Sequence, residues 1–342
     1  MAMPIETDAL VIGAGPVGLF QAFQLGLQGI HCHVVDALPH VGGQCAELYA
    51  DKPIYDIPGI PVCTGQELVE RLQNQLTPLA PTWHLGQTVD SLQATASGAW
   101  AVSTTQGTQW LTRTVFIAAG VGAFVPRSLP IDGLTPHLGQ QVWFGSQALP
   151  DFAGQHLLVA GDSDTALQIC LDAIPAAASV TLMHRREHFS AEPERLQAFL
   201  AAQAAGRVRF VAGQATGMLQ NGDRLSGLNY LDGEGQNATL ACEQLVMALG
   251  LSPKLGPVAQ WGLAMERKQL VVNTEDFSTT ESGIFAVGDI NTYPGKKKLI
   301  LCGFHEATLA AFGAVALLRP AEKTLLQYTT TSTLLHQRLG IA

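Results

Sequence analysis

Three glycines near the beginning of the chain have the spacing of a dinucleotide cradle. Gly13, Gly15 and Gly18 form the pattern GxGxxG, and an acid, Asp36, follows them. The first glycine permits a tight turn, the second lets backbone N–H groups approach a pyrophosphate, and the third allows a helix to pack closely on a strand. The carboxylate of Asp36 can accept a hydrogen bond from a ribose hydroxyl. These residue types therefore predict a nucleotide-binding turn.

The segments around this turn decide how specific the motif is, because GxGxxG also occurs as a glycine turn in ordinary α/β units. Residues 9–12 are an apolar run of strand length, and residues 17–28 have a helical pattern. Residues 31–35 form a second apolar run that ends at the acid. A strand, turn, helix and strand in this order is the context that a dinucleotide site requires, so we expect one here.

A second copy of this unit occupies residues 155–186. The spacing repeats, since Gly13 precedes Asp36 by 36 − 13 = 23 positions and Gly161 precedes His184 by 184 − 161 = 23 positions. Two such units in one chain are a more specific indication of nucleotide binding than one.

The two copies differ at the end of their second strand. His184, Arg185 and Arg186 stand where the first copy has its acid. Cations at this position suit a 2′-phosphate, which a carboxylate would repel. The second copy is therefore predicted to bind NADP(H), and the first a ribose without that phosphate. A solvated basic turn is the alternative interpretation of the cations.

The second copy also departs from the glycine pattern. Ser163 replaces the middle glycine, and it is flanked by Asp162 and Asp164. Carboxylates near a pyrophosphate are unfavourable unless they point away from it. We expect this departure to weaken nucleotide binding.

The chain of 342 residues is longer than one hydrophobic core usually covers, so we expect two domains. Its 47% hydrophobic and 14% charged residues suit a well-buried α/β protein. Residues 83–120 and 208–250 show the alternation and turn signals of antiparallel strands. The predicted fold is α/β, with two Rossmann-like nucleotide-binding domains, each a parallel sheet with a small antiparallel insertion. We expect residues 1–123 and 247–342 in the first domain and residues 124–246 in the second.

Two further segments carry side chains that could meet a cofactor. Residues 38–60 are rich in glycine, proline and aromatic residues, and offer an amide in Gln44 and a flat ring in Tyr49. Asp289 ends a predicted strand and can hold a sugar-alcohol hydroxyl of a flavin; an acidic strand end or a helix cap is the alternative. The lysine run beside it, residues 296–298, is either a solvated loop or a docking point for an acidic partner.

Composition argues against several other functions. A net charge of −9 disfavours a nucleic-acid surface. We expect no targeting signal and no membrane association, since no apolar run approaches the roughly eighteen residues that a membrane span needs. The six cysteines form no CxxC, so we expect reduced thiols in a cytoplasmic protein and neither a metal site nor a dithiol centre.

Five motifs occur in order over almost the whole chain: GAGPVG, GGQCAELYADKPIYDIPG, HRREHF, GIFAVGD and TYPGKKKLILCGFHEA. Together they resemble the thioredoxin-reductase-like class of ferredoxin–NADP⁺ reductases, which are two-domain flavoproteins. The resemblance implies FAD and NADP(H) as cofactors, a ferredoxin or similar acidic electron carrier as partner, and a homodimer. Thioredoxin reductase is similar in fold but carries a redox CxxC, and the matching residues 141–152 contain no cysteine.

The resemblance also implies roles for single residues. The implied FAD contacts are Gly13, Gly15, Gly18, Asp36, Gln44, Tyr49, Val89, Phe124, Asp289 and Thr330. Tyr49 would stack on one face of the flavin, and the resemblance leaves open whether Tyr328 stacks on the other. His184, Arg185 and Arg186 match the site of the 2′-phosphate. No residue is implied as an acid, a base or a nucleophile, because the cofactors carry the chemistry.

The predicted activity is electron transfer between NADP(H) and ferredoxin, by hydride transfer to the flavin and single-electron transfer to an iron–sulfur partner. Three alternatives remain open. The chain could be a flavoenzyme of the same fold with another donor or acceptor, such as a quinone. It could be a disulfide reductase that uses an isolated cysteine such as Cys45, or a non-catalytic flavin redox sensor.

Overall fold

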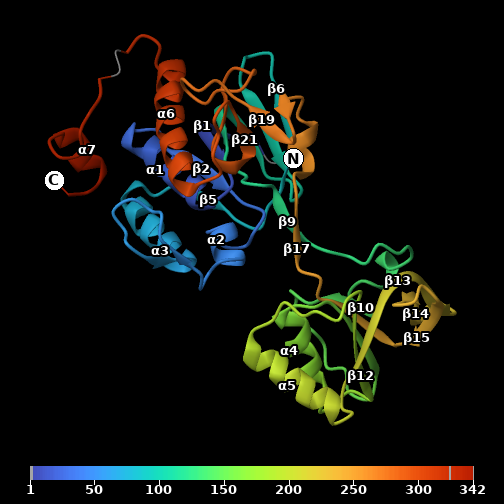
Figure 1. Cartoon of the computed structure of the whole chain (residues 1–342). Coiled ribbons are helices and arrows are strands. Elements are labelled where there is room, and N and C mark those ends of the chain that lie inside the picture. The colour runs from blue at the N-terminus through green and yellow to red at the C-terminus, as the bar shows by residue number, and fades with distance from the viewer. Residues whose placement is uncertain (1–2, 323–324, 342) are drawn as a thin grey trace. The chain divides into compact units, whose positions relative to one another are not determined.

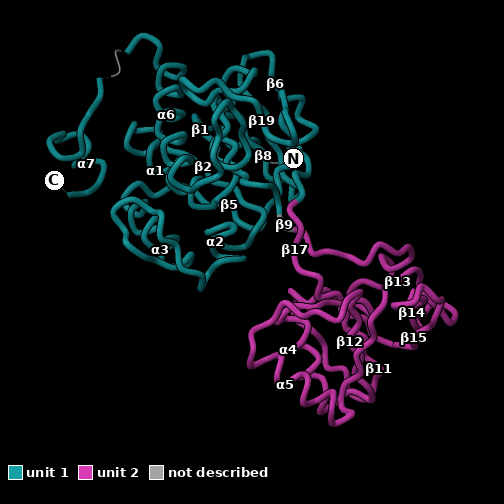
Figure 2. The backbone as a smooth tube through the Cα atoms, in the orientation of Figure 1, with its two compact units in different colours: residues 1–123, 254–342 teal, residues 124–253 magenta. Residues whose placement is uncertain are grey.

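The computed structural model describes residues 3–322 and 325–341. The chain forms two compact units (Figures 1 and 2). Unit 1 comprises Met1–Ala123 and Lys254–Ala342, and unit 2 comprises Phe124–Pro253. Unit 2 is thus inserted into the sequence of unit 1.

The chain returns to unit 1 at residue 254, whereas we expected the return at residue 247. The reason is the pairing of β16 (Gln244–Met247), which lies between β10 (Val142–Phe144) and β11 (His156–Ala160) inside the sheet of unit 2. The chain passes between the units twice, once in β9 (Ala123–Pro126) and once in β17 (Leu251–Lys254). These two strands pair with each other.

Unit 1 contains a mixed sheet in which parallel strands lie beside antiparallel ones. Its strands in spatial order are β5 (Thr82–His84), β2 (Cys32–Val35), β1 (Ile5–Ile12), β8 (Gln109–Ile117), β7 (Trp100–Thr104) and β6 (Val89–Ala94). β7 pairs with the first half of β8 in antiparallel orientation, and β20 (Ile284–Ala286) pairs with the second half in parallel. The predicted antiparallel piece therefore continues the parallel sheet.

Helices of unit 1 pack on one another beside this sheet, with α1 in contact with both α3 and α6 (Figure 1). A Thr64–Glu67 capping box begins α3. The helices are α1 (Pro16–Leu27), α2 (Gln44–Glu47), α3 (Gly65–Leu76), α6 (Ile300–Leu318) and α7 (Thr333–Arg338). The shorter elements are β3 (Pro53–Ile54), β4 (Cys63–Thr64), β18 (Met265–Glu266), β19 (Gln269–Val271), β21 (Asn291–Thr292), and the 3₁₀ turns η1 (Thr77–Leu79), η3 (Gly256–Gln260) and η4 (Gly288–Ile290).

Helix α6 contradicts the expectation that no apolar segment reaches the length of a membrane span. It has 19 residues and a mean hydropathy of 1.6. Its composition has a role within unit 1, because the small side chains of Ala307, Ala310 and Ala314 are fully buried and the helix contacts α1 and β8. Small residues let these elements approach closely.

The carbonyls at the C-terminal end of α1 and just after it are held by two arginines from the end of the chain. The guanidinium of Arg338, in α7, donates to the carbonyl of Leu27. That of Arg319 donates to the carbonyls of Gln28 and Gly29 over 3.1 and 3.0 Å. Cations are favourable here, because unpaired carbonyls give this end of a helix a partial negative charge.

Unit 2 repeats the design of unit 1 with a second sheet. Its strands in spatial order are β10, β16, β11, β12 (Ser179–His184), β13 (Arg209–Asn221), β14 (Arg224–Asp232) and β15 (Asn237–Ala241). β10, β16, β11, β12 and the beginning of β13 are parallel, whereas β13, β14 and β15 are antiparallel. The other elements of this unit are α4 (Asp164–Ala173), α5 (Pro193–Ala204) and η2 (Thr135–His137). The predicted fold class is confirmed.

Two histidines on neighbouring strands of unit 1 form a hydrogen-bonded pair. Nδ1 of His33 lies 2.9 Å from Nε2 of His84, and Trp110 donates its indole N–H to the same Nδ1 over 3.4 Å. Nδ1 of His33 therefore acts as an acceptor, which requires the neutral ring. Burial, together with nearby His84 and His31, lowers the pKa of His33 to about 4.

We expect this pair to make unit 1 sensitive to acid. Residue 33 in the unfolded chain binds a proton as the pH falls through 6.5, whereas the folded form does so only near pH 4. The free energy of unfolding therefore falls with pH across this window. Melting temperatures at pH 7 and pH 5 should differ less in His33→Leu than in the wild type. The exposed control His188→Leu should keep the wild-type difference; an unchanged difference in His33→Leu contradicts the prediction.

Candidate functional site

Only glycine fits at two positions where β1 passes into α1, one in the turn and one in the first turn of the helix. Gly13 has a φ of +110°, and a Cβ there would lie 2.4 Å from the carbonyl oxygen of Ala118. A Cβ on Gly18 would lie 1.9 Å from the carbonyl oxygen of Gly13. The N–H of Gly13 donates to the carbonyl of Val35 over 2.8 Å, so the turn is tied to β2.

Gly15 lies close to a second glycine turn, since a Cβ on Gly43 would lie 3.0 Å from the Cα of Gly15. The N–H of Gly42 donates to the carbonyl of Ala14 over 2.9 Å, which joins the two turns. A Cβ on Gly15 would meet nothing closer than the Cα of Gly43, at 3.9 Å. Because Gly15 is also the N-cap of α1, the unpaired amides of the first helical turn lie beside these two glycine turns. The arrangement fits a pyrophosphate, since backbone amides and the positive helix end both favour an anion.

Asp36 lies at the end of β2 beside this turn. One carboxylate oxygen accepts from the backbone N–H of Ala14 over 2.6 Å, and the other accepts from Leu38 over 2.8 Å. Burial raises the pKa of Asp36, whereas these two hydrogen bonds act in the opposite direction. Each oxygen keeps a second lone pair with which it can accept from a sugar hydroxyl.

The other predicted contacts of the first cradle have different surroundings. Gln44 reaches the glycine turn that follows β8, because a Cβ on Gly120 would lie 3.3 Å from its Nε2. Tyr49, in the same loop, is 47% exposed and presents its ring to the surface. Val89 is buried in the core at the beginning of β6. The side chain of Phe124 lies outside the part that the structure describes.

No hydrogen bond joins Thr330 to this cradle among the described residues. Thr330 is exposed and precedes α7, which is attached to the C-terminal end of α1 through Arg338. Gly15 lies at the opposite end of that 12-residue helix, roughly 18 Å away along its axis.

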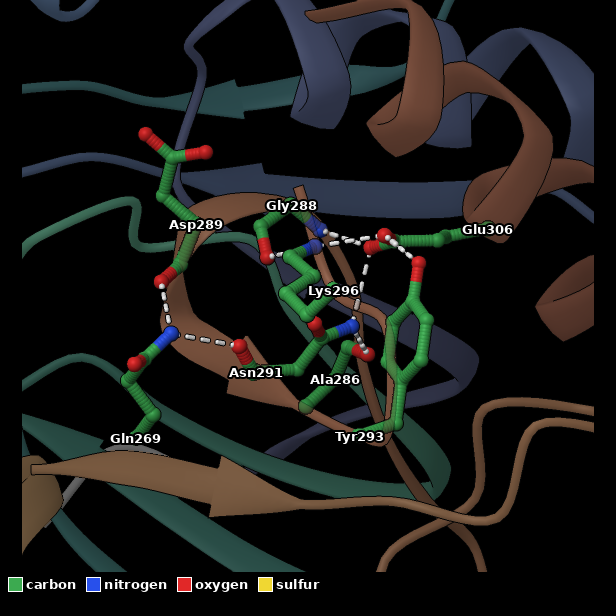
Figure 3. A network of polar contacts seen from close by, with 8 residues as sticks. All are labelled: Gln269, Ala286, Gly288, Asp289, Asn291, Tyr293, Lys296 and Glu306. Carbon is green, nitrogen blue, oxygen red and sulfur yellow. Dashed lines mark hydrogen bonds and ion pairs between the residues drawn. The ribbon is translucent and has the colours of Figure 1, made fainter. Parts of the chain in front are cut away.

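Asp289 lies on a turn that follows β20, at the sheet edge where β1, β2 and β8 also end. Gly288 has a φ of +80°, which favours glycine. Burial raises the pKa of Asp289, and the ammonium groups of Lys296 and Lys298 oppose this shift. The carboxylate points away from the neighbouring polar network (Figure 3), and no hydrogen bond to it occurs among the described residues.

Sequence reasoning missed a buried ion pair behind this turn. Nζ of Lys296 lies 2.5 Å from Oε1 of Glu306, and their side chains are 7% and 0% exposed. Lys296 is therefore not part of a solvated lysine run. A lone acid within the apolar pattern of α6, ten positions after a lysine, was the signal that could have indicated the pair.

The second cradle has the same backbone hydrogen bonds as the first. The N–H of Gly161 donates to Met183 over 3.0 Å, as Gly13 donates to Val35. A Cβ on Gly161 would lie 2.3 Å from the carbonyl oxygen of Ala248, which corresponds to Ala118. The repeat found in the sequence is thus a repeat of hydrogen bonding and close approach.

The two acids of the second cradle point at partners of their own. Asp164 accepts from the backbone N–H of Glu192 over 2.9 Å and pairs with Arg195 at 3.3 Å. Asp162 lies 3.6 Å from Nε2 of His184. Ser163, between them, is the N-cap of α4 without a side-chain capping bond. Most of the predicted conflict with a phosphate is therefore removed.

The predicted cations differ in exposure. His184 is partly buried, and its Nδ1 lies 3.0 Å from the carbonyl of Arg186. Arg185 and Arg186 are exposed, and neither forms an ion pair within the described residues. These two guanidinium groups are available to an anion at the end of β12.

Comparison with known proteins identifies the family. A family model described as pyridine nucleotide-disulphide oxidoreductase matches residues 7–308. Ferredoxin–NADP reductases of Paracidovorax citrulli and Acidovorax sp. are each 56% identical to this chain, covering 99% of it and 97% of the relative. The chain belongs to the ferredoxin–NADP reductase family. It is thus an oxidoreductase, and members of the family depend on FAD and NADP(H), which confirms the predicted cofactors.

Solved structures agree with this family in fold. Thioredoxin reductase of Lactococcus lactis has a TM-score of 0.56 and 22% identity, covering 91% of this chain and 99% of that one. Bacillithiol disulfide reductase of Staphylococcus aureus has a TM-score of 0.61 and 15% identity, with the same coverage. These likenesses support the two-domain fold alone.

The description of the matching family mentions disulphide chemistry, which would need an activated thiol. Cys45 is not such a thiol. Burial, with Cys63 and Asp289 nearby, raises the pKa of Cys45 to about 11. The protonated thiol is a poor nucleophile at neutral pH. Among the described residues, no group of three or more His, Cys, Asp or Glu side chains is placed to hold a metal ion.

The glycine geometry predicts unequal effects of two substitutions on the free energy of unfolding. Gly18→Ala should lower the free energy of unfolding by about 1–3 kcal/mol, because its Cβ meets backbone that must move. Gly15→Ser, which copies Ser163, should change it by less than about 0.5 kcal/mol, because serine is a good N-cap and a Cβ there meets only an ordinary van der Waals contact with Gly43 at 3.9 Å. Urea denaturation of both variants checks this; equal losses would contradict it.

Proposed function

We propose that this chain transfers electrons between NADP(H) and a ferredoxin, with FAD bound by unit 1 and NADP(H) by unit 2. The observation that carries the proposal is the duplicated cradle with opposite charge at equivalent strand ends. Asp36 follows β2 in the first copy, and Arg185 and Arg186 follow β12 in the second. An acid suits a ribose and repels a 2′-phosphate, whereas guanidinium groups bind that phosphate.

The first cradle fits FAD. The two glycine turns approach each other closely at Gly15 and Gly43, and Asp36 has lone pairs free beside the first turn. The residues proposed to hold FAD are Gly13, Gly15, Gly18, Asp36, Gln44, Tyr49, Val89, Phe124 and Asp289. When bound, FAD links two-electron exchange with a nicotinamide to one-electron exchange with an iron–sulfur protein. The side chains then need only bind, orient and cover the cofactor.

The second cradle fits NADP(H) through its exposed cations. Arg185 and Arg186 are free to form bidentate bonds with a phosphate. His184 is turned toward Asp162 and supports the strand end. Ser163 adds a hydroxyl donor where the first copy has only backbone.

Replacing both arginines tests this assignment. Arg185→Ala/Arg186→Ala should raise KM for NADPH about 10- to 100-fold, because charge-assisted hydrogen bonds to the 2′-phosphate are lost. KM for NADH should change less than about twofold, since NADH lacks that phosphate. The exposed control Arg207→Ala should leave both values unchanged. Equal effects on NADPH and NADH would overturn the assignment.

An acidic carrier has two candidate docking cations beside Asp289. Lys297 and Lys298 are exposed, whereas Lys296 is engaged with Glu306. Lys298 is close enough to act on the pKa of Asp289, which lies at the proposed flavin site. With a net charge of −9, the rest of the chain repels an acidic partner on average. We therefore propose that ferredoxin docks at Lys297 and Lys298.

NADPH-driven reduction of a cytochrome coupled through ferredoxin tests the activity. The FAD-loaded wild type should support it, and failure of an intact yellow enzyme would refute the proposed function. In the same assay Lys297→Glu/Lys298→Glu should raise KM for ferredoxin about 10-fold at low salt. Reduction of an uncharged quinone should not change, and neither should any value for the exposed control Lys268→Glu. If the variant lost as much quinone reduction as ferredoxin reduction, the two lysines would not act through the docking of ferredoxin.

We further propose a cytoplasmic homodimer. Thr330 and Tyr328 are exposed, and the α7 helix that follows them is attached through Arg338 to the C-terminal end of α1, opposite the end that carries Gly15. Their implied contact with a flavin therefore fits a neighbouring subunit. Disulfide reduction is disfavoured as an alternative by the raised pKa of Cys45.

A further inference from the structure

The carboxylate of Glu306 is a four-fold acceptor buried at the beginning of α6 (Figure 3). Oε2 accepts from the backbone N–H of Gly288 over 2.7 Å and from Nδ2 of Asn291 over 2.9 Å. Oε1 accepts from the hydroxyl of Tyr293 over 2.9 Å and from Nζ of Lys296. A carboxylate has about four lone-pair directions, so both oxygens are saturated. Only an anionic side chain can satisfy this set of donors.

The other partners in the network are fixed in their roles. Nδ2 of Asn291 also donates to the carbonyl of Ala286 over 2.7 Å, so the orientation of the amide is determined by two acceptors. Burial, with Glu306 nearby, raises the pKa of Tyr293, which therefore remains a hydrogen-bond donor. Nζ of Lys296 also donates to the carbonyl of Gly288 over 2.8 Å. Hydrogen bonding of this kind offsets the cost of burying the two charges, although Oδ1 of Asn291 has no partner among the described residues.

All four donors come from one short segment, the nine residues that begin at Gly288. The network therefore folds this segment back on Glu306 and holds the turn that carries Asp289. From the other side, Nε2 of Gln269 donates to the carbonyl of Asp289 over 3.2 Å and to that of Asn291 over 2.7 Å. The backbone of Asp289 is thus fixed on both sides, while its carboxylate points away from the network (Figure 3).

We propose that Glu306 and Lys296 are positioning residues for the flavin. Their ion pair sets the conformation of the Gly288–Asn291 turn, so that Asp289 presents its carboxylate to the FAD without having to be ordered when FAD binds. Preorganisation of this kind raises the affinity for FAD, because the turn is already ordered in the folded chain and loses little entropy when FAD binds. The inference rests on the proposed function, in which Asp289 is a contact of FAD.

The ion pair allows a test by rescue. Lys296→Met leaves the buried carboxylate of Glu306 without its cation, and Glu306→Gln leaves Lys296 without its anion while an amide N–H₂ faces donors. The double variant Lys296→Met/Glu306→Gln is neutral and of similar volume. The glutamine oxygen can then accept from Gly288 and Asn291, and its N–H₂ group can donate to the oxygen of Tyr293.

The experiment strips the full-length chain of FAD and measures the dissociation constant on retitration, with the melting temperature of the stripped chain measured in parallel. Each single variant should raise the dissociation constant about 10-fold or more. The double variant should return to within about threefold of the wild type. The visible circular dichroism of the bound flavin should change in the single variants and recover in the double variant. Lys268→Met, at an exposed lysine of unit 1, should match the wild type.

Two reference variants keep the outcome decisive. Asp289→Asn should weaken FAD binding if Asp289 is a contact; an unchanged value overturns both that assignment and the inference. A second outcome overturns the inference alone. In it, Asp289→Asn weakens FAD binding, whereas the Lys296 and Glu306 variants keep the wild-type affinity for FAD and only lower the melting temperature. Tyr293→Phe removes one donor and keeps the ion pair, so it provides a milder variant if Glu306→Gln does not fold. Its dissociation constant should rise two- to fivefold, and no rise would also count against the inference.

Discussion

Parallel pairing of β1 with β2 and β8 is the interaction on which the first cradle depends. Because the three strands run in the same direction, their ends meet at one edge of the sheet. The N–H of Ala118 donates to Ile12 over 2.8 Å, and the N–H of Gly13 donates to Val35 over the same distance. The glycine turn is therefore bonded to the strands on both sides. A slip of one residue in either pairing would reverse the facing of every side chain and separate these groups.

Duplication of this arrangement explains how one chain can recognise two nucleotides. The backbone hydrogen bonds of the turn are the same in both copies. The copies differ at the residue after the first glycine and at the residue that ends the second strand. In the first copy, the amide of Ala14 binds Asp36. In the second, the side chain of Asp162 approaches His184, at the equivalent positions. The first copy thus has a hydrogen bond from backbone to acid where the second has an acid beside an imidazole. The two arginines that follow this imidazole lie at the surface.

Features that depend on neighbours in the sequence were predictable. The glycine turns, the strands beside them and the repeat of 23 positions follow from residue types and spacing. Contacts between distant residues were not. Lys296 belongs to a run of three lysines, and only the position of Glu306 distinguishes it from the other two. The length of α6 was missed for a related reason. Its lone acid, Glu306, and its small residues interrupt a count of consecutive apolar residues, but in the fold that acid is paired with Lys296.

The order of segments along the chain constrains how unit 1 can assemble during synthesis. β20, α6 and α7 all follow unit 2 in the sequence. Until they have been made, the second half of β8 lacks its partner β20, and the carbonyls beyond α1 lack Arg319 and Arg338. Unit 2 is therefore complete in the emerging chain while unit 1 still has an open sheet edge. Such an edge is a template for unwanted strand pairing, so the second half of β8 is the part of the nascent sheet that is exposed to it.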